Sequence, residues 1–348
     1  MKKVITILLA FSLVFGIFAG CGNKKETQKK KVKDDGIMKI LMIGHSTGMD
    51  SAYMLPAIAK NEGVEKLVVG MLYHSGCRLG QHVDYLTTDA AQYAYYEFDI
   101  ETQDGWLRAD CDGNFTDCAP FAANDIYIED GSIAQTMKFG IQRHDWDIIV
   151  MQAGGSENAN LPDGSYAPNF ASDIKTIQDY VVANDIEKST APKFAWNMVW
   201  GCPEDISMVN GHYKDVIDTL FNGDPTAWYP AIIETNKNII QPEKNFTWFM
   251  PSATAKQNAQ AMGVPIQELY RDYIHGSDYT RMMVSYLWYC VLFNKNIDDC
   301  TLAPIPAKLV FDAKMYNTGT PFELTEEQKN ILKSSIKNAI ANPYEVTN

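Results

Sequence analysis

The sequence predicts an α/β fold with three layers, in which helices cover both faces of a doubly wound, mostly parallel sheet. Two observations support this prediction. Short apolar runs alternate along the chain with amphipathic segments, which is typical of parallel strands joined by crossover helices. The 348 residues are also 46% hydrophobic, which is enough for one large core.

The first 21 residues are predicted to be a lipoprotein signal peptide. Met1-Lys2-Lys3 precede an apolar run over residues 4–18, and Ala19-Gly20 stand directly before Cys21. This pattern resembles the lipobox of bacterial lipoproteins, in which the cysteine is lipidated, although Phe18 stands where leucine is usual. The alternatives are an ordinary cleaved signal or a single membrane span, but the run is short for the roughly 20 residues that a span needs.

Residues 22–36 are rich in lysine and almost without apolar side chains, so we expect a flexible tether. Residues 37–348 are then a single domain. The whole chain has a formal charge of −13, and the lysine-rich tether makes the domain more acidic still, which argues against nucleic acid as a partner. The expected location is the extracellular or periplasmic side of the cell membrane, with the membrane bound through lipid on Cys21.

Six cysteines remain besides Cys21, and an even number in an exported chain permits disulfides. The close pairs are Cys111/Cys118 and Cys290/Cys300, while buried free thiols are an equally open alternative. No cysteine has zinc-site spacing, and His74 and His82 lack a third ligand. We therefore expect no metal and no cofactor.

The expected elements follow from the apolar runs and from the periodic segments between them. Strands are predicted over residues 38–44, 66–73, 146–152, 193–198 and 246–250. Helices are predicted over residues 53–61, 132–142, 170–183, 209–221, 254–262, 279–293 and 325–341. Alternating aromatic and polar residues separated by Asp104-Gly105 predict a hairpin insertion at about residues 93–130.

Three polar or glycine positions closely follow predicted strands: Ser46, Gly76 and Gln152. In an open parallel sheet, ligands bind beyond the carboxyl ends of the strands. These residues are therefore expected to converge at one edge of the sheet, where a composite site can form.

Ser46 lies between Gly44 and Gly48 on a predicted strand-to-helix turn, with the helix expected to begin around Asp50 or Ser51. A serine is a weak nucleophile unless an imidazole activates it and a carboxylate orients that imidazole. Asp272 and His275, three residues apart, could supply both groups. Taken alone, Ser46 could be a simple turn residue, and the Asp272–His275 loop could only cap the helix that follows.

In order, spacing and context, Ser46 and the Asp272-x-x-His275 pair resemble the SGNH, or GDSL-like, hydrolase superfamily. The resemblance spans residues 38 to about 292. It implies a flavodoxin-like three-layer fold and a catalytic triad of Ser46, His275 and Asp272. It also implies an oxyanion hole built from the Ser46 N–H, Gly76 and a side-chain amide after the third strand.

Two positions depart from the family pattern. The usual Gly-x-Asn after the third strand is absent, and Gln152 is similar to the glutamine of sialate O-acetylesterase-like branches, so we prefer it to Asn158. His45 replaces the aspartate or asparagine that usually precedes the serine. Adjacent residues on an extended turn tend to point apart, so His275 is preferred to His45 as the base.

Two further residues are candidates for substrate binding. Arg78 lies in the same loop as Gly76, although a surface ion pair would also explain it. Asn258 lies in the helix predicted over residues 254–262, near the same edge of the sheet, although a helix start explains Ser252 and Thr254 of that segment without any ligand.

The expected function is that of a surface-anchored serine esterase that removes small acyl groups, acetyl in particular, from carbohydrate. Two alternatives use the same fold. One is a catalytically degenerate glycan-binding lipoprotein, which the altered motifs favour. The other is an acyltransferase that uses the same triad.

Overall fold

The computed structural model describes residues 36–117, 132, 134–154, 156–159, 167–185, 190–310 and 318–347. The predicted signal peptide, Cys21 and nearly all of the tether lie outside the described residues. The described residues fall within one compact unit, Val32–Asn348. In these parts of the chain no helix combines the length and the apolar character needed to cross a membrane.

A parallel core of five strands lies within a nine-stranded sheet of the described residues. The strands of this core are neighbours in the order β2-β1-β7-β8-β9, and each adjacent pair is parallel. All five predicted strands are confirmed, with ends that differ by at most two residues. They are β1 (Met38–Gly44), β2 (Leu67–Tyr73), β7 (Ile148–Met151), β8 (Lys193–Asn197) and β9 (Phe246–Met250).

Antiparallel strands extend the sheet beyond β2. β3 (Tyr93–Asp99) pairs with β2, and β4 (Leu107–Ala109) lies between β3 and β5 (Phe115–Asp117). The short β6 (Ala134–Gln135) also pairs with β3. The segment in which a hairpin was expected thus contributes edge strands to the sheet, and residues 118–130 of that segment lie outside the described residues.

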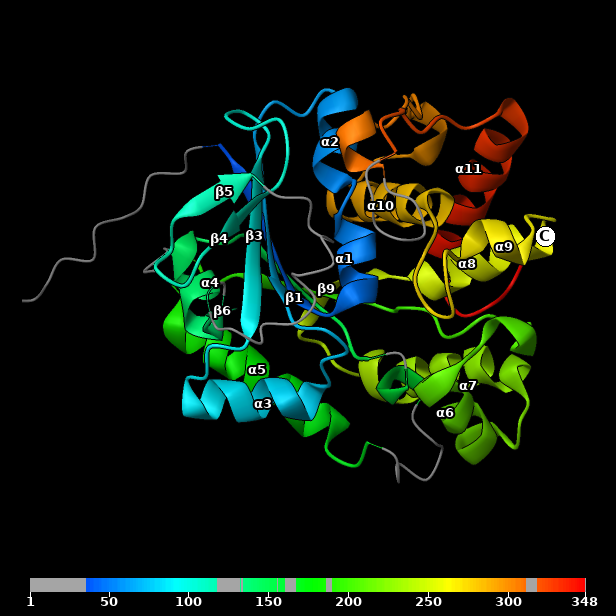
Figure 1. Ribbon diagram of the computed structural model, residues 1–348, viewed down its shortest axis with the longest axis horizontal. Helices are drawn as coiled ribbons and strands as arrows, with labels where there is room; N and C mark the ends of the chain where they lie inside the picture. The colour runs from blue at the N-terminus through cyan, green and yellow to red at the C-terminus, as the bar shows by residue number, and fades with distance from the viewer. Residues whose placement is uncertain are drawn as a thin grey trace, which may run out of the picture. The chain divides into compact units, whose positions relative to one another are not determined.

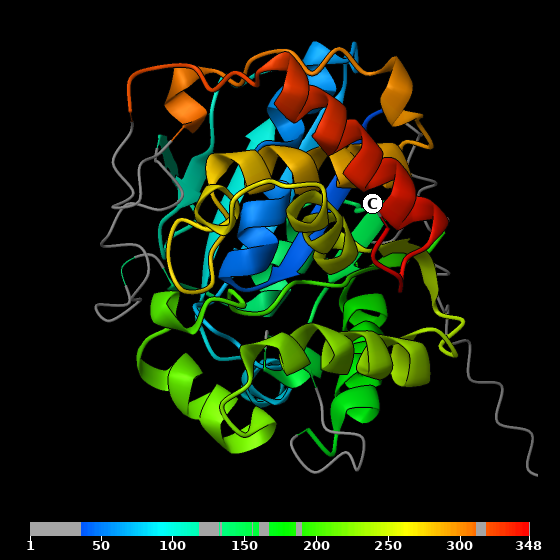
Figure 2. The same ribbon diagram turned by 90° about the vertical axis from the view of Figure 1, so that its right-hand side faces the viewer.

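Helices cover both faces of the sheet, which confirms the predicted three layers (Figures 1 and 2). One side carries α1 (Ser46–Ala52), α2 (Leu55–Asn61), α8 (Ser252–Ala261), α10 (Asp278–Leu292) and α11 (Glu326–Ala341). The other carries α3 (Leu79–Thr88), α4 (Met137–Arg143) and α5 (Phe170–Asn184). Between β8 and β9, the chain forms α6 (Gly211–Phe221) and α7 (Trp228–Thr235), at the lower right of Figure 1. The four-residue α9 (Ile266–Leu269) precedes the loop of Asp272 and His275.

The start of the first helix differs from the prediction. We expected it to begin around Asp50 or Ser51, which was wrong, because α1 begins at Ser46 itself. The helix predicted over residues 53–61 begins later, as α2, with Pro56 in its first turn. Proline has no N–H to donate and is tolerated there, which favours a new helix start at this point over a continuous helix.

Close packing beneath α1 requires two glycines. A Cβ atom at Gly48 would lie 2.2 Å from the side-chain amide of Gln152, and one at Gly44 would lie 2.6 Å from the same amide. Gln152 is 2% exposed. The end of β7 and the start of α1 can therefore approach each other only because both positions lack a side chain.

The predicted cysteine pairs have different outcomes. Cys118 lies outside the described residues, so the pair Cys111/Cys118 stays a prediction. Cys290 and Cys300 are neighbouring buried free thiols, and the Cys300 thiol donates to the carbonyl of Asn296 at 3.6 Å. The chain thus brings this pair together, as its spacing indicated, in the thiol form.

We expect Gly48→Ala to destabilise the fold by about 1–3 kcal/mol, because the new methyl group overlaps Gln152 and overpacking of a core costs roughly that much. Urea unfolding followed by circular dichroism measures the loss. Gly80→Ala is the matched control, since its Cβ in α3 would meet its nearest atom at an ordinary 3.5 Å. Equal stability of the two variants would contradict the packing described here.

Candidate functional site

The ends of three parallel strands place the candidate residues at one edge of the sheet. Gly44 pairs with Tyr73 on β2, and Ile43 pairs with Met151 on β7, so the segments that follow these strands start side by side. Numbered in chain order, the five parallel strands lie in the doubly wound order 2-1-3-4-5. The chain adds its second strand on one side of β1 and its later strands on the other side, so the switch point lies between β1 and β7. Ligands of open α/β sheets bind at such a switch point.

Ser46 is the first residue of α1 and is partly exposed. In the first turn of a helix, backbone N–H groups have no acceptor within the helix. Both the hydroxyl and the N–H of Ser46 therefore lie at the end of α1 that faces the switch point. This is the position expected for a nucleophile that also contributes an oxyanion donor.

Asp272 and His275 are hydrogen-bonded to each other. The Nδ1 of His275 lies 2.7 Å from Oδ2 of Asp272, whose Oδ1 accepts from the N–H groups of Ile274 and His275 at 2.9 and 2.8 Å. Burial tends to raise the pKa of Asp272, but the bonds from His275 outweigh it and hold that pKa well below its usual range. A carboxylate that accepts from Nδ1–H leaves Nε2 of His275 as the basic nitrogen.

Asp50 joins the loop of Asp272 and His275 to α1. Its Oδ2 accepts from the N–H of Gly276 at 2.9 Å, and its Oδ1 accepts from Arg271 at 2.8 Å. Asp50 lies one helical turn after Ser46, and residues four apart share a face of a helix. The loop is therefore held on the same face of α1 that carries Ser46.

Two arginines compensate the buried charge of Asp50. Its side chain is 0% exposed, and Arg281 donates to it at 3.0 Å in addition to Arg271. Burial alone would raise the pKa of Asp50, but the two guanidinium groups lower it below its usual value. Asp50 is thus a paired carboxylate inside the protein, and both arginines are bound to it.

No hydrogen bond joins the two described side chains of Ser46 and His275, whereas the bond between Asp272 and His275 is formed. Gly276, the residue after His275, is hydrogen-bonded to Asp50, which lies one turn after Ser46 on α1. Catalytic hydrogen bonds to a nucleophile are often long until substrate is bound. The candidate base therefore lies on a loop that is bonded to the helix of the candidate nucleophile.

Both ring nitrogens of His45 form hydrogen bonds within the fold. Its Nε2 donates to the carbonyl oxygen of Ala153 at 3.0 Å, and its Nδ1 accepts from Thr47 at 3.3 Å. Burial lowers the pKa of His45 to about 4. Because both ring nitrogens are occupied and the ring stays neutral, His45 is poorly suited to act as the base.

The expected oxyanion donors differ in their surroundings. Gly76 lies exposed in the turn after β2 with a φ of +60°, a conformation that favours glycine. Gln152 donates to the carbonyl of His45 at 3.3 Å and accepts from Asn197 at 3.1 Å. These contacts give Gln152 a supporting role beneath the turn of Ser46, and its role as an oxyanion donor stays a prediction. Asn158, the rejected alternative, is fully buried and donates to the carbonyl of Val199.

The two candidates for substrate binding have different positions. Arg78 is exposed and lines a pocket of about 270 Å³ that also includes Glu157 and Asp173. Asn258 is fully buried, donates to the carbonyl of Ser335 in α11, and accepts from the N–H of Thr347. Asn258 therefore joins α8 to the C-terminal part of the chain, and our expectation that it faces substrate was wrong.

Several residues of the site were not predicted. Asn197 connects Gln152 to Ser51 and accepts from Ser252, so a buried polar network underlies α1. Asp50 and its two arginines were missed as well. The spacing of Asp50, four residues after Ser46, is the one sequence signal that could have indicated a polar group on the same helical face.

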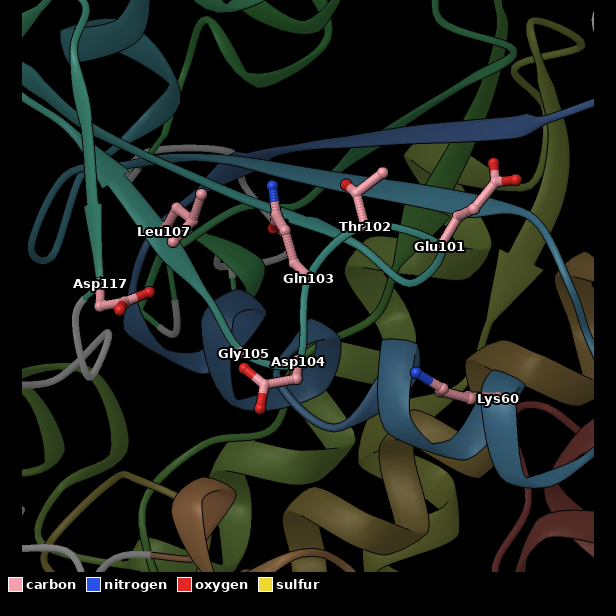
Figure 3. A pocket seen from close by; sticks show the side chains of 8 residues that line it. All are labelled: Lys60, Glu101, Thr102, Gln103, Asp104, Gly105, Leu107 and Asp117. Atoms are coloured by element: carbon pink, nitrogen blue, oxygen red, sulfur yellow. The ribbon is translucent and has the colours of Figure 1, made fainter.

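A separate pocket of about 530 Å³ lies near the start of β2, at the opposite edge of the sheet (Figure 3). Its side chains come from α2, from the loop after β3, and from β4 and β5. The described lining contains no histidine, serine or cysteine. It consists of Lys60, Glu101, Thr102, Gln103, Asp104, Gly105, Leu107 and Asp117. Of these two places, only the switch-point edge therefore carries the candidate nucleophile and the candidate base.

The fold defines the class: an α/β protein in which helices flank a mostly parallel sheet. Within that class, the chain is similar to a solved structure described as a DUF4886 family protein from Bacteroides uniformis. The TM-score is 0.63 at 18% sequence identity, and the match covers 89% of this chain and 97% of the other. At this identity the similarity establishes the fold alone. No protein-family model matches the chain, and no curated protein does.

We expect Asp50→Asn to destabilise the protein by about 3 kcal/mol, because it removes the fully buried carboxylate that Arg271 and Arg281 share, and Arg281 then keeps its ion pair with Asp278. Chemical denaturation measures the loss. Asp179→Asn, which removes an exposed ion pair with Lys175, should have little effect. If the two variants proved equally stable, Asp50 would not be the anchor of the loop.

The buried neutral His45 predicts a pH dependence of stability. Its pKa is about 4 in the folded protein and 6.5 in the unfolded chain, so the unfolded state binds more protons between these values and stability falls as the pH falls. The loss reaches about 3 kcal/mol near pH 4.

The His45→Gln variant keeps a donor for the carbonyl of Ala153 and removes the titration. The free energy of unfolding of the wild type should therefore decline more steeply between pH 7 and pH 4 than that of His45→Gln. His212→Gln, at an exposed position of α6, is the control. Parallel curves for wild type and His45→Gln would refute the neutral, buried state of His45.

Proposed function

We propose that this protein is an SGNH-type serine esterase that removes small acyl groups, acetyl in particular, from carbohydrate. The observation that carries the proposal is the 2.7 Å hydrogen bond between Asp272 and His275, on a loop that Asp50 holds to the helix of Ser46. A nucleophile, a base and an orienting carboxylate are the three groups that acyl transfer through serine requires.

In the proposed reaction the hydroxyl of Ser46 attacks the ester carbonyl while Nε2 of His275 takes its proton. His275 then returns that proton to the leaving alcohol, and Asp272 stabilises the imidazolium that exists between the two steps. Water repeats the sequence on the acyl-enzyme, which releases the acid and regenerates Ser46. Backbone N–H groups at Ser46 and Gly76 are the proposed donors to the oxyanion.

Aromatic residues beside His275 support a carbohydrate as the alcohol. Tyr273 lies between Asp272 and His275 in sequence, and its ring centroid is 5.5 Å from that of Tyr213 on α6. Both rings are partly exposed. Tyrosine offers an apolar face together with a polar edge, a combination that suits a sugar ring. The positive charges of Arg271 and Arg281 are both bound to Asp50, so neither is proposed to bind the substrate.

The proposed location follows from the N-terminal sequence. Lipid on Cys21 would anchor the enzyme to the cell membrane, and the tether would let the domain reach polymers outside the cell. The acidic domain is proposed to act without a nucleic-acid partner.

A second candidate is a catalytically degenerate protein that binds glycan through the same site. Two observations favour it: the buried position of Gln152 and the absence of a hydrogen bond between the described side chains of Ser46 and His275. The acyltransferase alternative shares every step up to the acyl-enzyme and differs only in the acceptor.

We expect Ser46→Ala to lower the hydrolysis of p-nitrophenyl acetate by at least about 10³-fold, because it removes the attacking hydroxyl. The circular dichroism spectrum should stay unchanged. Ser334→Ala, at an exposed position of α11, should keep the wild-type rate.

Acetylated oligosaccharides then distinguish the alternatives. Released acetate supports the esterase, and transfer of acetyl to an added sugar supports the acyltransferase. Glycan binding without turnover, together with equal rates for wild type and Ser46→Ala, would overturn the esterase proposal.

A further inference from the structure

Lys256 lies in α8, next to the loop that carries Asp272 and His275. Its side chain is 2% exposed, and among the described residues its amine has no hydrogen-bond acceptor. The amine nitrogen lies 2.9 Å from the ring centroid of Tyr270 and 4.6 Å from that of Trp200. Aromatic faces attract a cation, more strongly when it is desolvated. The cost of burying an ammonium that has no hydrogen-bond acceptor is larger than this attraction, so the charge state of Lys256 requires an explanation.

Both aromatic rings are fixed to the catalytic loop. Trp200 donates from its indole nitrogen to the carbonyl of Ile274 at 2.7 Å. Tyr270 lies at the start of the loop and forms an antiparallel backbone bridge with Gly276. Its hydroxyl donates to the carbonyl of Gly201 at 3.0 Å. The Lys256 amine therefore contacts two rings that join the loop to the segment that follows β8.

Four titratable groups influence Lys256 from neighbouring segments: Asp50 on α1, Asp272 and Arg271 on the loop, and Cys202 after β8. Burial is the dominant influence and lowers the pKa of Lys256 well below its usual value, which the two carboxylates only partly oppose. Each carboxylate already has its own partners, since Asp50 binds two arginines and Asp272 binds His275.

We propose that Lys256 is a positioning residue that acts as an uncharged amine. It fills the space between Trp200 and Tyr270, holds the loop of Asp272 and His275 in place, and adds no positive charge near the imidazolium that forms at His275. A charged lysine at this position would oppose that imidazolium and raise the barrier to attack. This inference rests on the proposed esterase function.

The test compares Lys256→Met and Lys256→Ala with the wild type, using p-nitrophenyl acetate across a range of pH. Methionine keeps the length and the apolar contacts, so kcat/KM should stay within about threefold of wild type and the acid-side midpoint of the pH profile should not move. The thermal midpoint should be equal or higher, because an unsatisfied buried nitrogen is removed. Alanine leaves a gap, so kcat should fall by about tenfold or more with KM nearly unchanged.

Two results would overturn the proposal. A shift of the acid-side midpoint to higher pH by about half a unit in Lys256→Met would mean that the wild-type lysine carries a charge that depresses the pKa of the base. A wild-type kcat in Lys256→Ala would mean that the loop does not depend on this side chain.

The charge of Lys256 can also be measured directly, by a method that does not depend on enzyme activity. In wild-type protein labelled with ¹³C at the lysine ε-carbons, the Lys256 resonance is assigned by its loss in Lys256→Met. We expect the chemical shift of an uncharged amine at pH 7, and an ammonium shift there would refute the proposal. If Ser46→Ala retained full activity instead, the esterase proposal would fail while the charge of Lys256 could still be read.

Discussion

The buried carboxylate of Asp50 is the interaction on which the candidate site depends. It binds the N–H of Gly276 and the guanidinium groups of Arg271 and Arg281, and it lies one turn after Ser46 on α1. A loop between helices has no repeating hydrogen bonds to hold it in one conformation, and fixing the backbone of each residue costs about 1–2 kcal/mol in lost entropy. The bonds to Asp50 offset that cost in the loop that carries His275, which must approach Ser46 in the proposed reaction.

The other side of the site is built by close packing. The turn that presents Ser46 is supported from below by Gln152, which fits only because positions 44 and 48 are glycine. Asn197 completes the hydrogen bonds of that glutamine and links it to α1 through Ser51. A hydrogen-bonded buried network of this kind favours one arrangement over its alternatives, so we expect it to hold the turn of Ser46 in place.

Most of the fold could be predicted from the sequence. The five core strands are apolar runs bounded by polar or turn residues, and such runs are recognisable without knowledge of their partners. Helices such as α10 were equally clear because their apolar faces are long. The start of α1 at Ser46 was missed, since Ser-Thr-Gly has low helix propensity and the helix is stabilised by burial against the sheet and α10.

The candidate site was only partly predictable. Ser46, Asp272 and His275 could be found because serine chemistry requires these residue types in positions that strand ends bring together. The environment of Gln152, Asn258 and Lys256 could not be found, because each depends on which distant segment covers it in the fold. Asn258 is a polar residue that closely follows a core strand, as a site residue would, yet it is buried against α11. Burial of a polar side chain by a remote helix leaves no local trace in the sequence.

The measurement that tests the central claim most directly is covalent labelling of the full-length chain with a fluorophosphonate probe, followed by peptide mapping. If Ser46 is activated by the pair that Asp50 holds in place, the probe attaches to Ser46, and the labelling rate falls by orders of magnitude in His275→Gln. Labelling at another residue, or an unchanged rate in that variant, would contradict the account.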